Sequence, residues 1–138
     1  MDGQVADGER IAAMAQWVRR HLRYESVSDS GTTAIDTYVA RRGVCRDYAH
    51  LVIALARAAG VPARFVSAYG ADVDPPDFHA VAELWIGGAW HLIDATGMAE
   101  PADLIRIATA ADAAGAAFMS IFGRGHPVDQ QIRVHRIS

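Results

Sequence analysis

The sequence predicts an α+β protein in which N-terminal helices pack on a mostly antiparallel β-sheet. Apolar residues recur at steps of three and four in the first part of the chain, and β-forming residues dominate from position 63 onward. Helices that precede strands, rather than alternating with them, are typical of this class. The length of 138 residues fits one domain. We therefore expect a single domain over 1–138, with a frayed end over 1–8.

The N-terminal part is expected to contain a long helix and a short one. Residues 9–22 carry apolar side chains at helical spacing, with charges on the other side. Thr33 offers an N-cap for the short helix, which Gly43 ends. Apolar side chains share one face of this short helix: Ile35, Tyr38 and Val39.

The clearest helix begins at Cys45. Its apolar residues form one continuous stripe from Cys45 to Ala59. Gly60 supplies the C-terminal stop, and Pro62 prevents continuation. The only cysteine of the chain therefore lies in the first helical turn, on the inward face.

Strands are predicted over 63–69, 79–86 and 89–94, with a loop over 70–77. The glycine pair at 87–88 between the last two strands is a strong hairpin signal. Beyond Pro101 the pattern is weaker. Residues there fit a helix or a strand over 102–107, and two further strands over 118–122 and 131–137.

The hairpin brings a histidine and an aspartate together. With the glycine pair as the turn, Trp85 faces Trp90, and the register continues to place Val81 opposite Asp94. His79 and Asp94 then become diagonal neighbours on one face, about 7 Å apart at the backbone. This spacing allows an imidazole–carboxylate hydrogen bond.

A thiol, an imidazole and a carboxylate are the groups that a cysteine nucleophile needs. The helix start favours the thiolate of Cys45. His79 would take and return the proton, and Asp94 would fix the imidazole tautomer. The Cys45 N–H would be one oxyanion donor. The second donor is not identified by the pattern, although Tyr24 is a candidate.

Other interpretations of these residues remain open. A lone cysteine on an apolar helical face is often an inert packed side chain. No CxxC or HExxH motif is present, so we expect no metal and no cofactor. A net charge of −3 without a basic run argues against nucleic acid or a membrane surface as partner, and no apolar stretch is long enough to span a bilayer. A single cysteine fits a cytoplasmic location.

The sequence resembles the transglutaminase-like superfamily, in particular its bacterial branch with a papain-like core. The matching segments are 42–51 (RGVCRDYAHL), 60–64 (GVPAR), 78–80 (FHA) and 90–96 (WHLIDAT). The family usually has Asp-Pro-Thr where this chain has Asp94-Ala95-Thr96, and often His-Ala-Trp where it has His79-Ala80-Val81. The resemblance implies a Cys45, His79, Asp94 triad on a papain-like fold.

We expect a thiol-dependent acyl-transfer enzyme that acts on amide bonds of proteins or peptides, with hydrolysis favoured. Nothing in the sequence marks a docking site for a second amine or a calcium switch. The alternatives are a protein-crosslinking transglutaminase, a non-catalytic peptide-binding module, and a structural domain with an unreactive Cys45. The sequence leaves the oligomeric state open.

Overall fold

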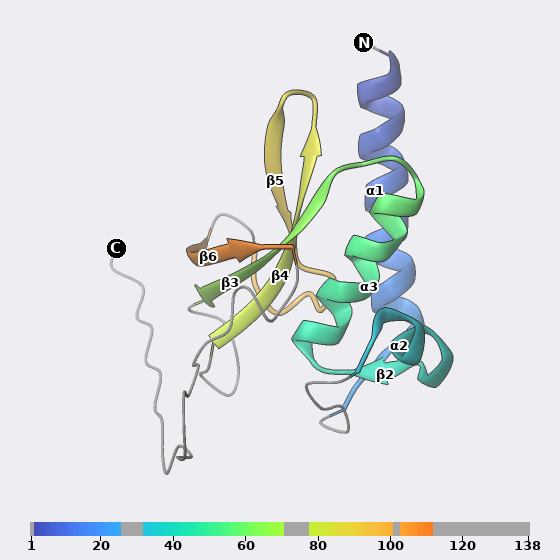
Figure 1. The fold of residues 1–138 in the computed structure, drawn as a ribbon, viewed down its shortest axis with the longest axis vertical. Helices are drawn as coiled ribbons and strands as arrows, with labels where there is room; N and C mark the ends of the chain where they lie inside the picture. Colours follow the sequence, from blue (N-terminus) through green and yellow to red (C-terminus); the bar gives the residue numbers. More distant parts are fainter. Residues whose placement is uncertain (1, 26–31, 71–77, 101–102, 112–138) are drawn as a thin grey trace.

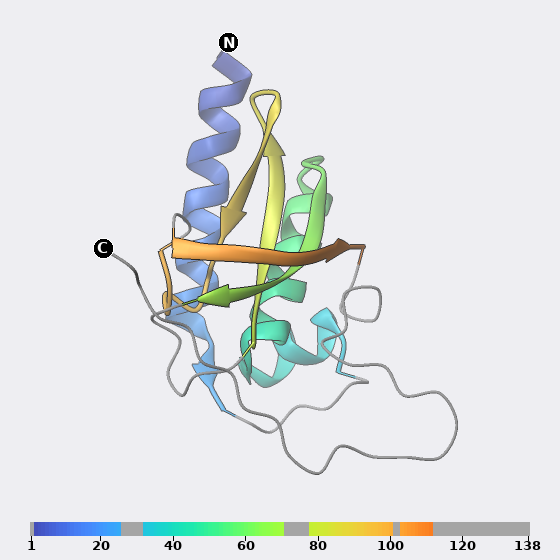
Figure 2. The same ribbon diagram turned by 90° about the vertical axis from the view of Figure 1, so that its left-hand side faces the viewer.

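A computed structural model describes residues 2–25, 32–70, 78–100 and 103–111 of the chain. The elements in chain order are α1 (Asp2–His21), β1 (Arg23–Tyr24), α2 (Ala34–Ala40), β2 (Arg42–Gly43), α3 (Cys45–Ala58), β3 (Ala63–Gly70), β4 (Phe78–Ile86), β5 (Ala89–Ile93) and β6 (Leu104–Ala110). Helices α1 and α3 lie side by side against a four-stranded antiparallel sheet of order β5-β4-β3-β6 (Figures 1 and 2). The predicted α+β class is confirmed.

The main core lies between these two helices and the sheet. Val18 of α1 and Val52 and Ala56 of α3 are fully or almost fully buried there. Alternate residues of β4 join the same core, among them Ala82 and Leu84. A smaller cluster includes Val81, the β4 residue next to Ala82. Its members are Val66, Ala68, Val81, Ala99 and Leu104. The apolar periodicity of the sequence therefore corresponds to real packing in α1, α3 and β4.

The two helices before Cys45 differ in detail from the prediction. Helix α1 begins at Asp2, earlier than residue 9. The Thr33 cap of α2 is confirmed, because its side chain accepts the Asp36 N–H at 3.1 Å. The helix ends before Gly43, however, since Arg41 adopts a left-handed conformation with φ of 60°.

The apolar face of α2 does not serve as its packing face. Ile35 and Val39 are each 75% exposed, whereas Thr37 between them is buried. The Thr37 hydroxyl donates to the Thr33 carbonyl at 3.2 Å, so its polar group is satisfied in the interior. Apolar spacing predicted the helix correctly but could not decide which side of so short a helix meets the core.

Helix α3 agrees closely with the prediction. It starts at Cys45, ends at Ala58, and is followed by Gly60 with φ of +82°. Because φ above zero strains any side chain, glycine is the residue expected at this stop. Cys45 occupies the first position of the helix and is half-buried.

The predicted hairpin is also confirmed. Trp85 pairs with Trp90 and Ile86 with Ala89, so the glycine pair forms the turn. The pairing of β4 with β5 stops at Ile93, which places Asp94 just beyond the last paired residue. Residues 104–110 form a strand that pairs with β3, so the part of the open segment 102–107 that begins at Leu104 is extended and not helical.

Gly70 belongs to β3, while the rest of the predicted loop, 71–77, lies outside the described residues. The strands predicted over 118–122 and 131–137 also lie outside them.

A short parallel pair of strands was not predicted. β1 pairs with β2 in the register Arg23 with Arg42 and Tyr24 with Gly43. Each strand has only two residues, so neither carries a periodic signal. The pair holds the segment after α1 against the segment that leads into Cys45.

Candidate active site

The turn into α3 depends on a close contact between Gly43 and Asp47. The Asp47 side chain is fully buried, and its Oδ2 accepts the Val44 N–H at 2.9 Å. A Cβ on Gly43 would lie 2.6 Å from the Asp47 Cβ, which is closer than two non-bonded carbon atoms can approach. Glycine at position 43 therefore lets Asp47 fold back and fix the backbone that presents Cys45. The carboxylate also lies in the first helical turn, where the helix dipole stabilises negative charge.

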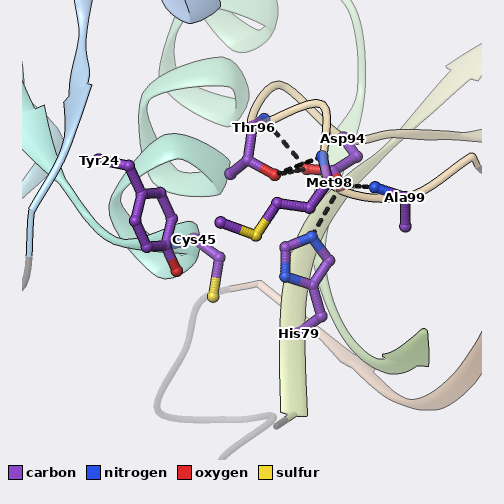
Figure 3. A network of polar contacts seen from close by, with 7 residues as sticks. All are labelled: Tyr24, Cys45, His79, Asp94, Thr96, Met98 and Ala99. Carbon is purple, nitrogen blue, oxygen red and sulfur yellow. Dashed lines mark hydrogen bonds and ion pairs between the residues drawn. The ribbon is translucent and has the colours of Figure 1, made fainter. Parts of the chain in front are cut away.

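His79 and Asp94 form a buried hydrogen-bonded pair. His79 Nε2 lies 2.8 Å from Asp94 Oδ2, and their side chains are 1% and 2% exposed. The other ring nitrogen, Nδ1, points toward the Sγ of Cys45 (Figure 3). The three residues named from the sequence thus meet in one place, although they come from α3, β4 and the segment after β5.

Asp94 is held by a network of donors from its own loop. Its Oδ1 accepts the Thr96 N–H at 3.0 Å and the Thr96 hydroxyl at 2.7 Å, and its Oδ2 accepts the Ala99 N–H at 3.2 Å (Figure 3). The loop continues through Gly97, whose φ is +73° and against which the Arg19 guanidinium packs. Four donors, counting His79, hold the carboxylate in one orientation toward the imidazole.

The same contacts shift the protonation of both groups. Burial acts to lower the pKa of His79, but its hydrogen bond to Asp94, its interaction with Cys45 and their negative charges raise the pKa from 6.5 to about 9. Burial acts to raise the pKa of Asp94, but the hydrogen bond and charge of His79 and the donors of Thr96 hold it below its ordinary value. The site therefore favours an imidazolium beside an ionised carboxylate at neutral pH.

Tyr24 reaches the site from β1. Its hydroxyl oxygen accepts the Cys45 N–H at 3.3 Å, and its ring lies 5.8 Å from the Tyr48 ring. The Tyr24 side chain lies beside Cys45 in the site (Figure 3). The sequence offered Tyr24 only as a guess, because the β1–β2 pairing that brings it there leaves no periodic signal.

Two further site residues, Asp47 and Thr96, were not singled out from the sequence. Asp47 had a usable signal, since an acidic residue three positions after an N-cap is a capping pattern. Thr96 had a weaker one, since Asp-x-Thr in a turn predicts local side-chain to backbone hydrogen bonds.

Within the described ranges, no three His, Cys, Asp or Glu side chains gather in a way that could hold a metal ion. None of the described helices has the length and apolar character that crossing a membrane requires.

The fold and the arrangement of Cys45, His79 and Asp94 define a papain-like α+β core. Residues 1–95 match the family described as the transglutaminase-like superfamily, and the chain belongs to it. The predicted family is confirmed.

Relatives and solved structures agree with this assignment. The chain is 33% identical over 91 residues to an uncharacterized protein of Mycobacterium leprae. The aligned region covers 59% of this chain and 32% of the relative. The chain therefore spans about a third of the length of that relative. A solved structure from Cytophaga hutchinsonii, described as a candidate cysteine protease, is 46% identical with a TM-score of 0.81, over 83% of this chain and 40% of the other.

A more distant structure shows the same fold. The crystal structure of a TGase superposes with a TM-score of 0.53 at 22% identity, over 64% of this chain and 26% of the other. Taken together, the family and the Cytophaga structure support a thiol-dependent enzyme.

Proposed function

We propose that this protein is a thiol-dependent acyl-transfer enzyme that cleaves amide bonds of proteins or peptides by hydrolysis. One observation carries the proposal. His79 lies between the Asp94 carboxylate at 2.8 Å and the half-buried thiol of Cys45. This order of groups is the one that nucleophile activation requires. Similarity to a candidate cysteine protease supports the same reaction class.

The first half of the reaction forms an acyl-enzyme. His79 Nδ1 takes the thiol proton, and the Cys45 sulfur attacks the carbonyl carbon of the amide. The Cys45 N–H stabilises the negative oxygen of the tetrahedral intermediate. The imidazolium then donates its proton to the leaving nitrogen as the C–N bond breaks, which leaves a thioester and a free amine.

The second half consumes water. His79 removes a proton from a water molecule, whose oxygen attacks the thioester carbon. The C–S bond breaks, the carboxylic acid product departs, and the thiolate–imidazolium pair is restored. Asp94 keeps its charge throughout and holds the imidazole with Nδ1 toward the sulfur.

The first test is chemical labelling of the thiol. Because Cys45 is the only cysteine, iodoacetamide alkylation reports on it alone. We expect wild type to react at mildly acidic pH, Cys45→Ala not to react, and His79→Ala to lose most of the reaction at that pH. His91→Ala is the matched control, since His91 is exposed on β5 and contacts the Ile86 carbonyl. Equal labelling of His79→Ala and of wild type would contradict an ion pair between Cys45 and His79.

The second test separates hydrolysis from crosslinking. Wild type and Cys45→Ala are incubated with peptide libraries, with and without an added primary amine, and the masses of the products are measured by mass spectrometry. We expect carboxylic acid products that persist when the amine is present. A product that becomes the amide of the added amine would instead establish transamidation, which the shared thioester intermediate permits.

A peptide-binding module without turnover is another alternative. The fold would then be retained while the thiol stays unacylated. Peptide binding by wild type and Cys45→Ala with equal affinity, and no thioester in either, would favour that function over catalysis.

A further inference from the structure

We propose that the Tyr24 hydroxyl is the second donor of the oxyanion hole, beside the Cys45 N–H. This inference rests on the proposed acyl-transfer function. Tyr24 would touch the substrate oxygen directly, so it would be a catalytic residue rather than part of the structural support.

The geometry around the Cys45 N–H is the first support. This N–H belongs to the first residue of α3, so no carbonyl of the preceding turn of helix is available to it. Asp47 satisfies the N–H of the preceding residue, Val44, at 2.9 Å. The Cys45 N–H instead points at the Tyr24 hydroxyl, 3.3 Å away. The Tyr24 hydroxyl thus lies within hydrogen-bond reach of the first oxyanion donor.

The backbone pairing around Tyr24 is the second support. Glu25 donates its N–H to the Gly43 carbonyl at 3.0 Å, and Arg23 donates to the Arg41 carbonyl at 3.0 Å. These bonds flank Tyr24 and tie it to the segment that ends at Cys45. The hydroxyl is therefore positioned by paired backbone and by the neighbouring Tyr48 ring, as a preorganised donor must be.

The chemistry and exposure of the hydroxyl are the third support. A tyrosine hydroxyl can accept one hydrogen bond and donate another. Without substrate it accepts from Cys45, and with a carbonyl oxygen in place both the N–H and the O–H can donate to that oxygen. Tyr24 is 44% exposed, whereas His79 is fully buried, so Tyr24 lies on the side that a substrate can reach.

The experiment compares two reactions of the same sulfur. Acylation by p-nitrophenyl acetate passes through a tetrahedral oxyanion, whereas alkylation by iodoacetamide does not. Both rate constants are measured for wild type, Tyr24→Phe and Tyr38→Phe at one pH. Tyr38 is the matched control, because it is similarly exposed at 46% but stacks on Trp17 of α1.

We expect Tyr24→Phe to slow acylation on the order of 100-fold and to leave alkylation within about twofold of wild type, since the thiolate itself is unchanged. Tyr38→Phe should match wild type in both reactions.

Three results would overturn the assignment. Unchanged or faster acylation by Tyr24→Phe would show that the hydroxyl only accepts from Cys45 and competes with the substrate oxygen. An equal loss in both reactions would show that Tyr24 acts on the thiolate and not on the oxyanion. Wild type that is alkylated but never acylated would refute the acyl-transfer function itself, and with it the role of Tyr24.

Discussion

The Asp94 carboxylate is expected to set both the charge and the tautomer of His79, and Asp94→Asn tests this with little change in side-chain shape. In wild type, His79 Nε2 donates to Asp94 Oδ2, which leaves Nδ1 toward the sulfur. An asparagine that turns its NH₂ group to His79 would reverse this bond. Nε2 would then accept, Nδ1 would carry the proton, and the thiol would have no base.

The size of the effect follows from the pKa of His79. Its rise from 6.5 to about 9 corresponds to about 3 kcal/mol in favour of the imidazolium, at about 1.4 kcal/mol for each pKa unit. Solvent screening is small because the His79 side chain is 1% exposed. Without the Asp94 charge, one of the two partners that offset burial is lost, so the pKa of His79 should fall from about 9. At about 1.4 kcal/mol for each factor of ten in rate, we therefore expect acyl transfer by Asp94→Asn to fall on the order of 100-fold near neutral pH.

The assay is the pH dependence of acylation by p-nitrophenyl acetate and of alkylation by iodoacetamide. In Asp94→Asn, alkylation should weaken at mildly acidic pH and recover only at alkaline pH, where the thiol ionises without help from His79. Asp36→Asn is the matched control, because Asp36 caps α2 through the Thr33 N–H at 2.9 Å and is not one of the triad groups. A pH profile of Asp94→Asn that coincides with wild type would refute this account of the pair.

Three other measurements test the same structure. Acyl transfer should decline as pH rises through about 9, because His79 then loses the proton that the leaving amine needs. The protonated His79 also stabilises the fold, fully below pH 6.5, and this stabilisation should be lost as pH rises from 6.5 through about 9. A chemical denaturation series from pH 6 to 10 that shows no such loss in the free energy of unfolding would contradict this. Gly43→Ala should lower the free energy of unfolding by about 1–3 kcal/mol, because its Cβ would lie 2.6 Å from the Asp47 Cβ, whereas Gly8→Ala, with open space around it, should raise it by up to about 1 kcal/mol. Glu83→Gln should lower the free energy of unfolding in urea by about 1–3 kcal/mol, because Glu83 is fully buried and forms ion pairs with two partly exposed arginines. An unchanged urea midpoint would show that these ion pairs contribute nothing to stability.

Local patterns in the sequence were sufficient for much of the fold. The helix that begins at Cys45 and the hairpin that turns at 87–88 were both predicted with their boundaries close to those observed. Both depend on interactions between residues near in the chain, and the apolar period and the glycine signals report those directly. The same hairpin register placed His79 and Asp94 as neighbours, and their 2.8 Å hydrogen bond agrees with it.

Contacts between distant segments were not accessible in this way. The end of α2 at Arg41 illustrates this, because a left-handed arginine is unfavourable by local preference. Its guanidinium lies over the rings of Trp17 and Tyr38, at 4.8 and 4.6 Å from their centroids. These cation–π contacts join α1 to α2 and offset the backbone cost. No pattern in the residues around Arg41 reports them.

The sequence alone determined which groups could react: one thiol at a helix start, and an imidazole and a carboxylate on one hairpin. Only the tertiary structure decided how they meet, with His79 Nδ1 toward the sulfur, Asp94 held by its loop, and Tyr24 brought to the Cys45 N–H by the β1–β2 pair. The physical reason is one of range. Periodicity records whether each side chain faces the core, but the orientation of a ring or a hydroxyl at a site is fixed by partners that lie far away in the chain.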